Sequence, residues 1–91
     1  MNICCQDLDL EKYELIDIRE EYEREEYAHP KALHIPMAKI IDEAENLSQD
    51  VNFVIHCQSG NRSEKIVKML HAKGHKNFLS LDGGANELQT L

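Results

Sequence analysis

One short segment of the chain combines residue types that could act together as a nucleophilic site. It covers residues 57–63 and reads Cys-Gln-Ser-Gly-Asn-Arg-Ser. Just upstream, residues 51–55 read Val-Asn-Phe-Val-Ile, which is typical of a short buried strand. Just downstream, apolar residues within 66–70 recur at helical spacing. The sequence therefore predicts that Cys57 ends a strand and that a helix begins just after it.

This position favours an acidic thiol at Cys57. A tight loop that enters a helix turns several backbone N–H groups inward and adds the positive end of the helix dipole. Gly60 allows these N–H groups to converge above the sulfur, and Arg62 adds a permanent cation with a planar fork suited to oxyanions. Such conditions lower a cysteine pKa to roughly 3.5–7.5. We therefore expect a nucleophilic thiolate, an anion-binding loop and an anionic substrate.

The loop resembles the active-site loop of the rhodanese-like sulfurtransferases, which runs Cys-x-x-Gly-x-Arg-Ser between a parallel strand and a helix. Cys57, Gly60, Arg62 and Ser63 match this pattern in order and spacing. Other segments resemble the family in the same order: residues 15–22 its Leu-Ile-Asp-x-Arg-Glu segment, residues 27–36 its His, Ala and Ile-Pro connection, and residues 81–84 its late double glycine. The resemblance covers nearly the whole chain.

The resemblance implies a rhodanese-like α/β fold in a single domain over residues 1–91, with a mainly parallel central sheet of about five short strands and helices on both faces. It also implies sulfur transfer. The Cys57 thiolate would take the outer sulfur of thiosulfate or another sulfane donor as a persulfide, which the loop N–H groups would hold. A thiol, cyanide or a sulfur-acceptor protein would then remove that sulfur, and no cofactor is required.

The resemblance also assigns roles to individual residues. Cys57 is the expected nucleophile, and Arg62 is expected to orient the anionic donor. The binding loop is completed by Gln58, Ser59, Gly60, Asn61 and Ser63, and Asp17 and Arg19 form a supporting pair.

The hydrophobic pattern itself predicts alternating strands and helices, hence a mainly parallel sheet with ligands at the carboxyl ends of its strands. Gly74 is expected to cap a helix, and Gly83 and Gly84 to form a tight turn. The expected strands lie near Ile3 and at 13–18, 32–35, 51–56 and 77–81; a helical turn is expected at 5–10, and helices at 20–27, 36–44, 62–73 and after Gly84.

Two positions depart from the family's pattern. The family's middle connection usually carries a glycine before its alanine, whereas residues 29–32 read His-Pro-Lys-Ala and are one residue shorter. We therefore expect an altered turn there. Four residues after the second glycine the family commonly places a tryptophan, whereas this chain has Leu88. We expect a short last helix.

Composition narrows the possible functions. The net charge is −7, yet residues 62–76 carry five basic side chains against Glu64 alone. An acidic chain is a poor candidate for nucleic-acid binding, but this basic stretch places positive potential beside the cysteine. We interpret its lysines as a solvated helix face. Residues 1–5 do not resemble a signal peptide and no run is apolar enough for a membrane helix, so we expect a cytoplasmic monomer without membrane partners.

Several residues have structural interpretations. His56 adjoins Cys57, but neighbouring side chains on a strand point to opposite faces, so we interpret it as structural rather than as a base. Ser63 is of a type that favours a helix N-cap, a role compatible with anion binding. Cys4 and Cys5 have no Cys-x-x-Cys pairing, so we interpret them as structural or incidental and predict no metal.

Two other functions stay open at this point. The sequence also resembles the cysteine phosphatases and arsenate reductases, some of which share the fold. Those phosphatases place five residues between Cys and Arg, whereas this chain places four, at 58–61, which fits one persulfide sulfur better than a phosphoryl group. The other possibility is a binding module without turnover, left open by the departures at Lys31 and Leu88.

Overall fold

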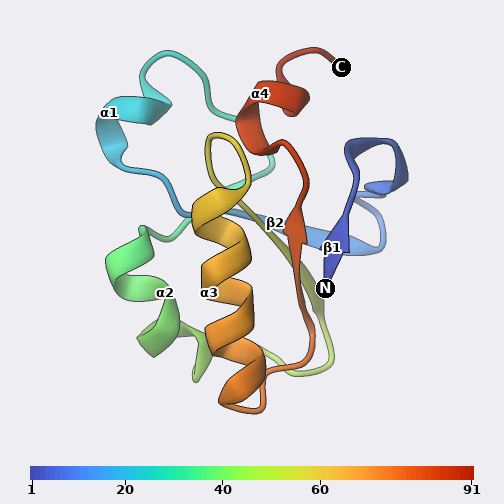
Figure 1. The fold of residues 1–91 in the computed structure, drawn as a ribbon, viewed down its shortest axis with the longest axis vertical. Helices are drawn as coiled ribbons and strands as arrows, with labels where there is room; N and C mark the ends of the chain where they lie inside the picture. The colour runs from blue at the N-terminus through green and yellow to red at the C-terminus, as the bar shows by residue number, and fades with distance from the viewer.

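Five parallel strands form one sheet, as the alternating pattern predicts (Figure 1). The structure is a computed structural model that describes residues 1–91. The strands are β1 (Asn2–Ile3), β2 (Tyr13–Asp17), β3 (Leu33–His34), β4 (Asn52–His56) and β5 (Phe78–Leu81), in the order β1-β5-β4-β2-β3. The helical elements are the 3₁₀ turn η1 (Cys5–Asp7) and the α-helices α1 (Glu21–Arg24), α2 (Met37–Ala44), α3 (Asn61–Ala72) and α4 (Gly84–Leu88).

Both faces of the sheet are buried, which explains why its strands are almost continuously apolar. Phe53 and Ile55 of β4 face α2 and α3, where they join the larger of two hydrophobic clusters. Val54, between them, faces the opposite side and packs with Leu88 of α4 and with the segment around η1. The fold class expected from the sequence, with helices on both faces, is confirmed.

The strand register brings the predicted site residues together at one end of the sheet. β2 and β4 are neighbours, and Asp17 lies opposite His56 in the ladder. Because both strands are parallel, their carboxyl ends meet at the same edge, where Arg19 and Cys57 follow. The loop between β4 and α3 also lies at this end of the molecule (Figure 1).

Two expectations about chain ends are confirmed, and the structure also describes the connection at residues 29–32. Gly74 follows the last residues of α3 with a φ of +97°, the left-handed conformation of a helix C-terminus. The last helix is short, and Leu88 is only 4% exposed. Residues 29–32 form a turn in which the Ala32 N–H donates to the carbonyl oxygen of His29 (3.1 Å).

The helix expected at 20–27 was wrong in extent, because α1 ends at Arg24. The carbonyl oxygens of Glu23 and Tyr27 accept hydrogen bonds from the buried guanidinium of Arg19, at 3.2 and 2.6 Å. A side chain from just before α1 thus takes the Glu23 carbonyl oxygen, which a longer helix would have satisfied internally. The turn expected at 5–10 is likewise shorter, since η1 ends at Asp7.

The N-cap of α3 was also predicted wrongly. The cap is Gly60, with a φ of +104°, and the helix begins at Asn61, one residue before the expected start. Ser63 lies in the first turn, where its hydroxyl donates to the Gly60 carbonyl oxygen at 3.1 Å. Ser63, three residues after the cap, therefore serves the loop instead of capping the helix.

None of the helices combines the length and the apolar character that crossing a membrane would require.

Leu88 tests how much the short last helix contributes to stability. Replacing Leu88 with Ala should lower the free energy of unfolding by about 2–4 kcal/mol, because it empties a buried site between β2, β4 and α4. Urea denaturation followed by circular dichroism measures this change. Leu91→Ala is the matched control, since Leu91 is 78% exposed. Equal stability of the two variants would contradict the packing described for α4.

Candidate active site

Cys57 occupies the centre of the loop that connects β4 to α3. Its side chain is only 1% exposed and belongs to the larger hydrophobic cluster. The sulfur nevertheless has polar neighbours on its loop side. The backbone N–H of Gly60 donates to Sγ at 3.1 Å and that of Ser63 at 3.4 Å, and the Ser63 hydroxyl oxygen lies 3.6 Å from Sγ. The loop therefore surrounds the sulfur with donors, as the sequence predicts.

These donors change the acidity of the thiol. Burial by itself raises the pKa of Cys57, but hydrogen bonds from the Ser63 N–H and hydroxyl and from the N–H groups of Gly60 and Ser59 lower the pKa more. The net result is a pKa below the usual value of a thiol. A hydrogen bond to the charged form stabilises that form, and the N-terminus of the 12-residue α3 acts in the same direction. Cys57 is thus prepared to react as a thiolate.

Ser80 extends this network, and the sequence analysis did not find it. Its hydroxyl lies 2.7 Å from the hydroxyl of Ser63, and its residue is almost fully buried on β5. If the Ser63 hydroxyl turns its proton from the Gly60 carbonyl oxygen toward a thiolate, its oxygen can still accept a hydrogen bond from the Ser80 hydroxyl. The only sequence signal was a serine within the otherwise apolar run 78–81.

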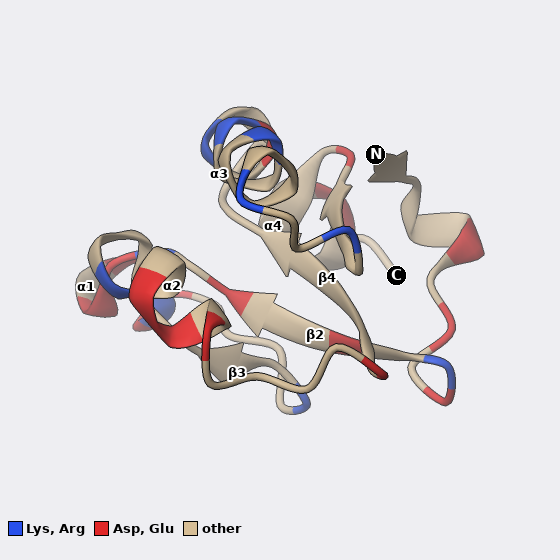
Figure 2. Cartoon of the chain, turned by 90° about the horizontal axis from the view of Figure 1, so that it is seen from below, with Lys and Arg blue, Asp and Glu red and all other residues tan.

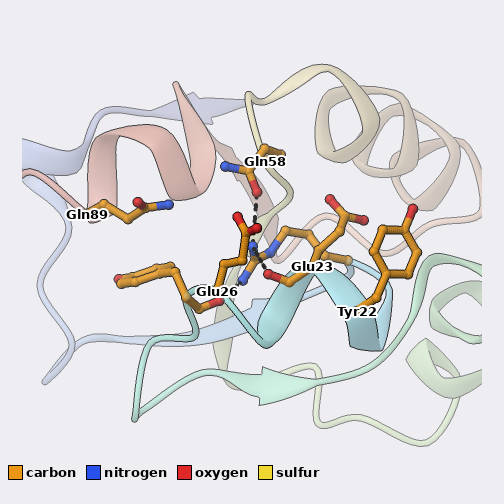
Figure 3. A pocket seen from close by; sticks show the side chains of 7 residues that line it. Tyr22, Glu23, Glu26, Gln58 and Gln89 are labelled. Carbon is orange, nitrogen blue, oxygen red and sulfur yellow. Dashed lines mark hydrogen bonds between the residues drawn. The ribbon is translucent and has the colours of Figure 1, made fainter.

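Asp17 and Arg19 anchor the loop from the neighbouring strand. The Arg19 guanidinium donates to both carboxylate oxygens of Asp17, at 2.9 Å to Oδ2 and 3.1 Å to Oδ1. Burial raises the pKa of Asp17, but the hydrogen bonds from the Arg19 side chain and N–H lower it more. Arg19 also donates to Oε1 of Gln58 at 3.0 Å (Figure 3). The supporting pair therefore contacts the loop directly.

The turn into α4 closes the loop from the other side. The N–H groups of Ala85 and Asn86 donate to the carbonyl oxygens of Cys57 and Gln58, at 2.8 and 3.0 Å. This approach requires a glycine, because a Cβ at Gly84 would lie 2.4 Å from the Cys57 carbonyl oxygen. The late double glycine thus forms the expected tight turn and also fixes the backbone that carries the sulfur.

Gln58 points away from the sulfur. Besides its contact with Arg19, its Nε2 donates to Oδ1 of Asn86 at 2.7 Å. Ser59 and Asn61 are exposed, and the structure gives neither side chain a contact with Sγ. Of the predicted loop side chains, only that of Ser63 reaches the sulfur; the others contribute through backbone N–H groups or line the surroundings.

Arg62 is engaged by a partner that the sequence analysis missed. Its two terminal nitrogens donate to the two carboxylate oxygens of Glu23 on α1, at 2.8 and 2.7 Å. The hydrogen bond from Arg62 lowers the pKa of Glu23, and the same contact raises the pKa of Arg62. Nothing in the sequence distinguishes Glu23 from the other acids of residues 7–26, since the partner lies 39 residues away.

This pair joins two segments of opposite charge: residues 7–26, which contain ten Asp and Glu, and the basic residues 62–76. Lys65 and Lys68 of α3 are exposed, in agreement with a solvated face, and Figure 2 shows the basic residues of α3 in blue.

A cavity of about 210 Å³ lies beside the loop on the α1 side (Figure 3). Its lining is Arg19, Tyr22, Glu23, Glu26, Tyr27, Gln58 and Gln89.

His56 lies on the opposite side of the sheet from Cys57, as strand alternation predicts. It is fully buried, its Nδ1 lies 3.0 Å from the Cys57 carbonyl oxygen, and its Nε2 lies 3.7 Å from Oδ2 of Asp17. Burial lowers the pKa of His56, which favours the neutral ring. Its contacts are those of a structural residue.

Cys4 and Cys5 lie near η1 on the other face of the sheet. The Cys4 thiol donates to Oδ2 of Asp7 at 3.1 Å. Burial and the nearby charge of Glu87 raise the pKa of Cys5, so this thiol stays protonated where Cys57 ionises. The pKa values of Cys5 and Cys57 are therefore shifted in opposite directions, and Cys57 is the candidate nucleophile.

Comparison with protein families identifies the family of this chain. The family model of the rhodanese-like domain matches residues 5–91. The chain belongs to the rhodanese-like family. The resemblance seen in the sequence is thereby confirmed.

Individual relatives place this rhodanese among single-domain sulfurtransferases. YtwF of Bacillus subtilis, which carries a sulfurtransferase name, is 39% identical over 74 residues, covering 81% of this chain and 71% of YtwF. The thiosulfate sulfurtransferase GlpE of Coxiella burnetii is 30% identical over 83 residues, covering 82% of this chain and 78% of GlpE. These relatives support a rhodanese sulfurtransferase in general.

A solved structure shows the same fold. The crystal structure of a rhodanese-related protein from Thermoplasma volcanium superimposes with a TM-score of 0.85 at 24% sequence identity, covering 98% of this chain and 91% of that one. The altered turn at residues 29–32 and the leucine at position 88 are therefore compatible with the rhodanese fold.

Ser63 provides a test of how the thiolate is stabilised. Replacing Ser63 with Ala removes the hydroxyl near Sγ but leaves the backbone N–H, so the pKa of Cys57 should rise and less thiolate should form at neutral pH. The rate of Cys57 alkylation by iodoacetamide at pH 7 should fall about threefold to tenfold. A pH series should show the reactivity lost as the pH falls through the lowered pKa of the wild-type thiol.

The control for this variant is Asn61→Ala, which changes an exposed side chain of the same loop without a contact to Sγ. An unchanged alkylation profile in folded Ser63→Ala would show that the hydroxyl does not stabilise the thiolate.

Proposed function

We propose that the protein transfers a sulfane sulfur from thiosulfate or a similar donor to a nucleophilic acceptor through a persulfide on Cys57. The observation that carries this proposal is the arrangement of the Gly60 N–H, the Ser63 N–H and the Ser63 hydroxyl around Sγ. These groups lower the pKa of the thiol without a neighbouring general base. The thiosulfate activity named for the relative GlpE supports the choice of donor.

In the first step the Cys57 thiolate attacks the outer sulfur of thiosulfate. The sulfur–sulfur bond of the donor breaks, sulfite leaves with the electron pair, and a Cys57 persulfide anion remains. Its negative charge lies on the outer sulfur, one S–S bond beyond Sγ and closer to the loop mouth. The N–H groups of Ser59 to Ser63 are available to hold this charge, much as an oxyanion hole holds a developing one.

In the second step a nucleophile attacks the outer sulfur and Cys57 returns to the thiolate. Cyanide, a small thiol or a sulfur-acceptor protein could serve as this acceptor, and the two half-reactions predict ping-pong kinetics. Both steps use only sulfur nucleophilicity and fixed dipoles, so the proposed cycle requires no cofactor. Arg62 is proposed to act on the donor in the first step.

The loop geometry favours sulfur over phosphate chemistry. Only four residues separate Cys57 from Arg62, and the N–H groups of Gly60 and Ser63 point at Sγ itself from 3.1 and 3.4 Å. Donors that are already this close to the thiolate leave little room for a tetrahedral phosphoryl group above it. The same donors would remain within reach of a persulfide.

Intact-mass measurement tests the proposal directly. Brief incubation with thiosulfate should add the mass of one sulfur atom, and a cyanide chase should remove it. Cys57→Ser should gain nothing, because it lacks the nucleophile, while Cys5→Ser should gain the sulfur normally, because its thiol is protonated and remote from the loop. A folded wild-type protein whose Cys57 alkylates readily but gains no sulfur from thiosulfate or from an organic persulfide would exclude this function.

A further inference from the structure

Glu23 holds the cation of the active site in a defined geometry. Its carboxylate accepts from both terminal nitrogens of Arg62 at 2.8 and 2.7 Å, the paired arrangement that matches a guanidinium best. Glu23 is 15% exposed and Arg62 35%, so the pair is partly withdrawn from water and less screened than a surface contact. Two of the five N–H donors of Arg62 are therefore occupied, and the other three can reach an oxyanion only beside this carboxylate.

The carboxylate is itself fixed by other contacts. Oε1 of Glu23 also accepts the N–H of Glu20 at 3.1 Å, as part of the capping box that begins α1. The carbonyl oxygen of Glu23 accepts from Nη1 of the buried Arg19. Because both its backbone and its side chain are held, the ion pair is part of the fold and costs little further side-chain entropy.

This arrangement changes what the site can attract. A thiosulfate dianion that approaches Cys57 meets a thiolate, a carboxylate and a guanidinium whose charge that carboxylate already balances. To use Arg62, thiosulfate must either displace Glu23 or bind the remaining N–H donors, and in both cases a carboxylate stays beside the new anion. An organic persulfide carries a carbon substituent where thiosulfate carries its sulfonate group, and it needs no cation at that position.

We propose that Glu23 determines the donor class, because its carboxylate neutralises Arg62 and occupies two of its donors, so that the site prefers organic persulfides to thiosulfate. We call this effect masking. This inference rests on the proposed function and narrows its donor. The cavity beside the pair supports it, since about 210 Å³ next to the loop can receive the organic part of a donor (Figure 3). The one cation in its wall, Arg19, is already paired with Asp17, so the cavity offers no free positive charge to a dianion.

The reaction with a persulfide is balanced without any further reagent. The Cys57 thiolate attacks the outer sulfur of R–S–SH, the S–S bond of the donor breaks, and the departing sulfur takes the electron pair. The proton of the outer sulfur passes to the leaving thiolate, which gives R–SH and the Cys57 persulfide anion. No oxidant or reductant is consumed.

Glu23→Gln tests the inference, because it removes the charge while keeping the size and an oxygen that can accept from Glu20. The KM for thiosulfate should fall and kcat/KM should rise about tenfold. The values for an organic persulfide whose carbon substituent is uncharged, that of N-acetylcysteine methyl ester, should change less than about twofold. A shift of the Cys57 pKa alone would alter the rates with both donors, so the contrast between donors isolates the masking.

Glu26→Gln is the matched control. It removes the same charge from the wall of the same cavity, but Glu26 makes no ion pair with Arg62. Its effect on thiosulfate kcat/KM should stay below about twofold. Equal gains in the Glu23 and Glu26 variants, or a thiosulfate KM that does not fall in Glu23→Gln, would overturn the masking role.

A binding measurement separates this inference from the proposed function. Calorimetric titration of thiosulfate into Cys57→Ser and into Cys57→Ser combined with Glu23→Gln requires no turnover, and the second protein should bind about tenfold more tightly. If the wild type takes sulfur from neither donor, sulfur transfer fails while this titration still decides the masking. If sulfur transfer is observed and both proteins bind thiosulfate equally, only the masking is excluded.

Discussion

The buried guanidinium of Arg19 is the interaction on which the rest of this site depends. It is 1% exposed, and its donors reach Asp17, Gln58 and the carbonyl oxygens of Glu23 and Tyr27. A charge withdrawn from water to this degree is tolerated only when its donors are satisfied, and removing one partner of such a pair typically costs about 3–5 kcal/mol. One side chain therefore ties the end of β2 to α1, to the chain after α1 and to the catalytic loop.

The chemistry at Cys57 depends on backbone dipoles more than on side chains. The N–H groups around Sγ are fixed by the loop conformation, which requires the positive φ of Gly60. Hydrogen bonds from the N–H groups of Ala85 and Asn86 to the loop carbonyl oxygens stabilise this conformation. Fixed dipoles in a water-poor site stabilise charge without having to reorganise. His56 precedes Cys57 in the sequence, but it does not act as a base for this thiol, because its side chain points to the opposite face of the sheet.

The parts of the structure that follow from local sequence were predictable, and those that follow from distant partners were not. The buried run at 51–56 and the helical spacing after Arg62 placed Cys57 correctly, because strand and helix periodicity are local properties. The extent of α1 was predicted wrongly because the Arg19 side chain donates to the carbonyl oxygen of Glu23, a contact that helical periodicity does not reveal. Likewise, Glu23 and Ser80 were missed because only the folded chain shows which acid and which serine reach the loop.

In the proposed cycle, different kinds of group stabilise the thiolate and select the donor. The loop N–H groups that surround Sγ belong to the backbone and are kept by any sequence that keeps the loop. The charge presented to a donor depends instead on Arg62 and on whether a carboxylate faces it. A single substitution on α1 could therefore change the preferred donor while the sulfur-holding loop stays intact. This separation gives a physical reason why one small fold can serve sulfur donors of different charge.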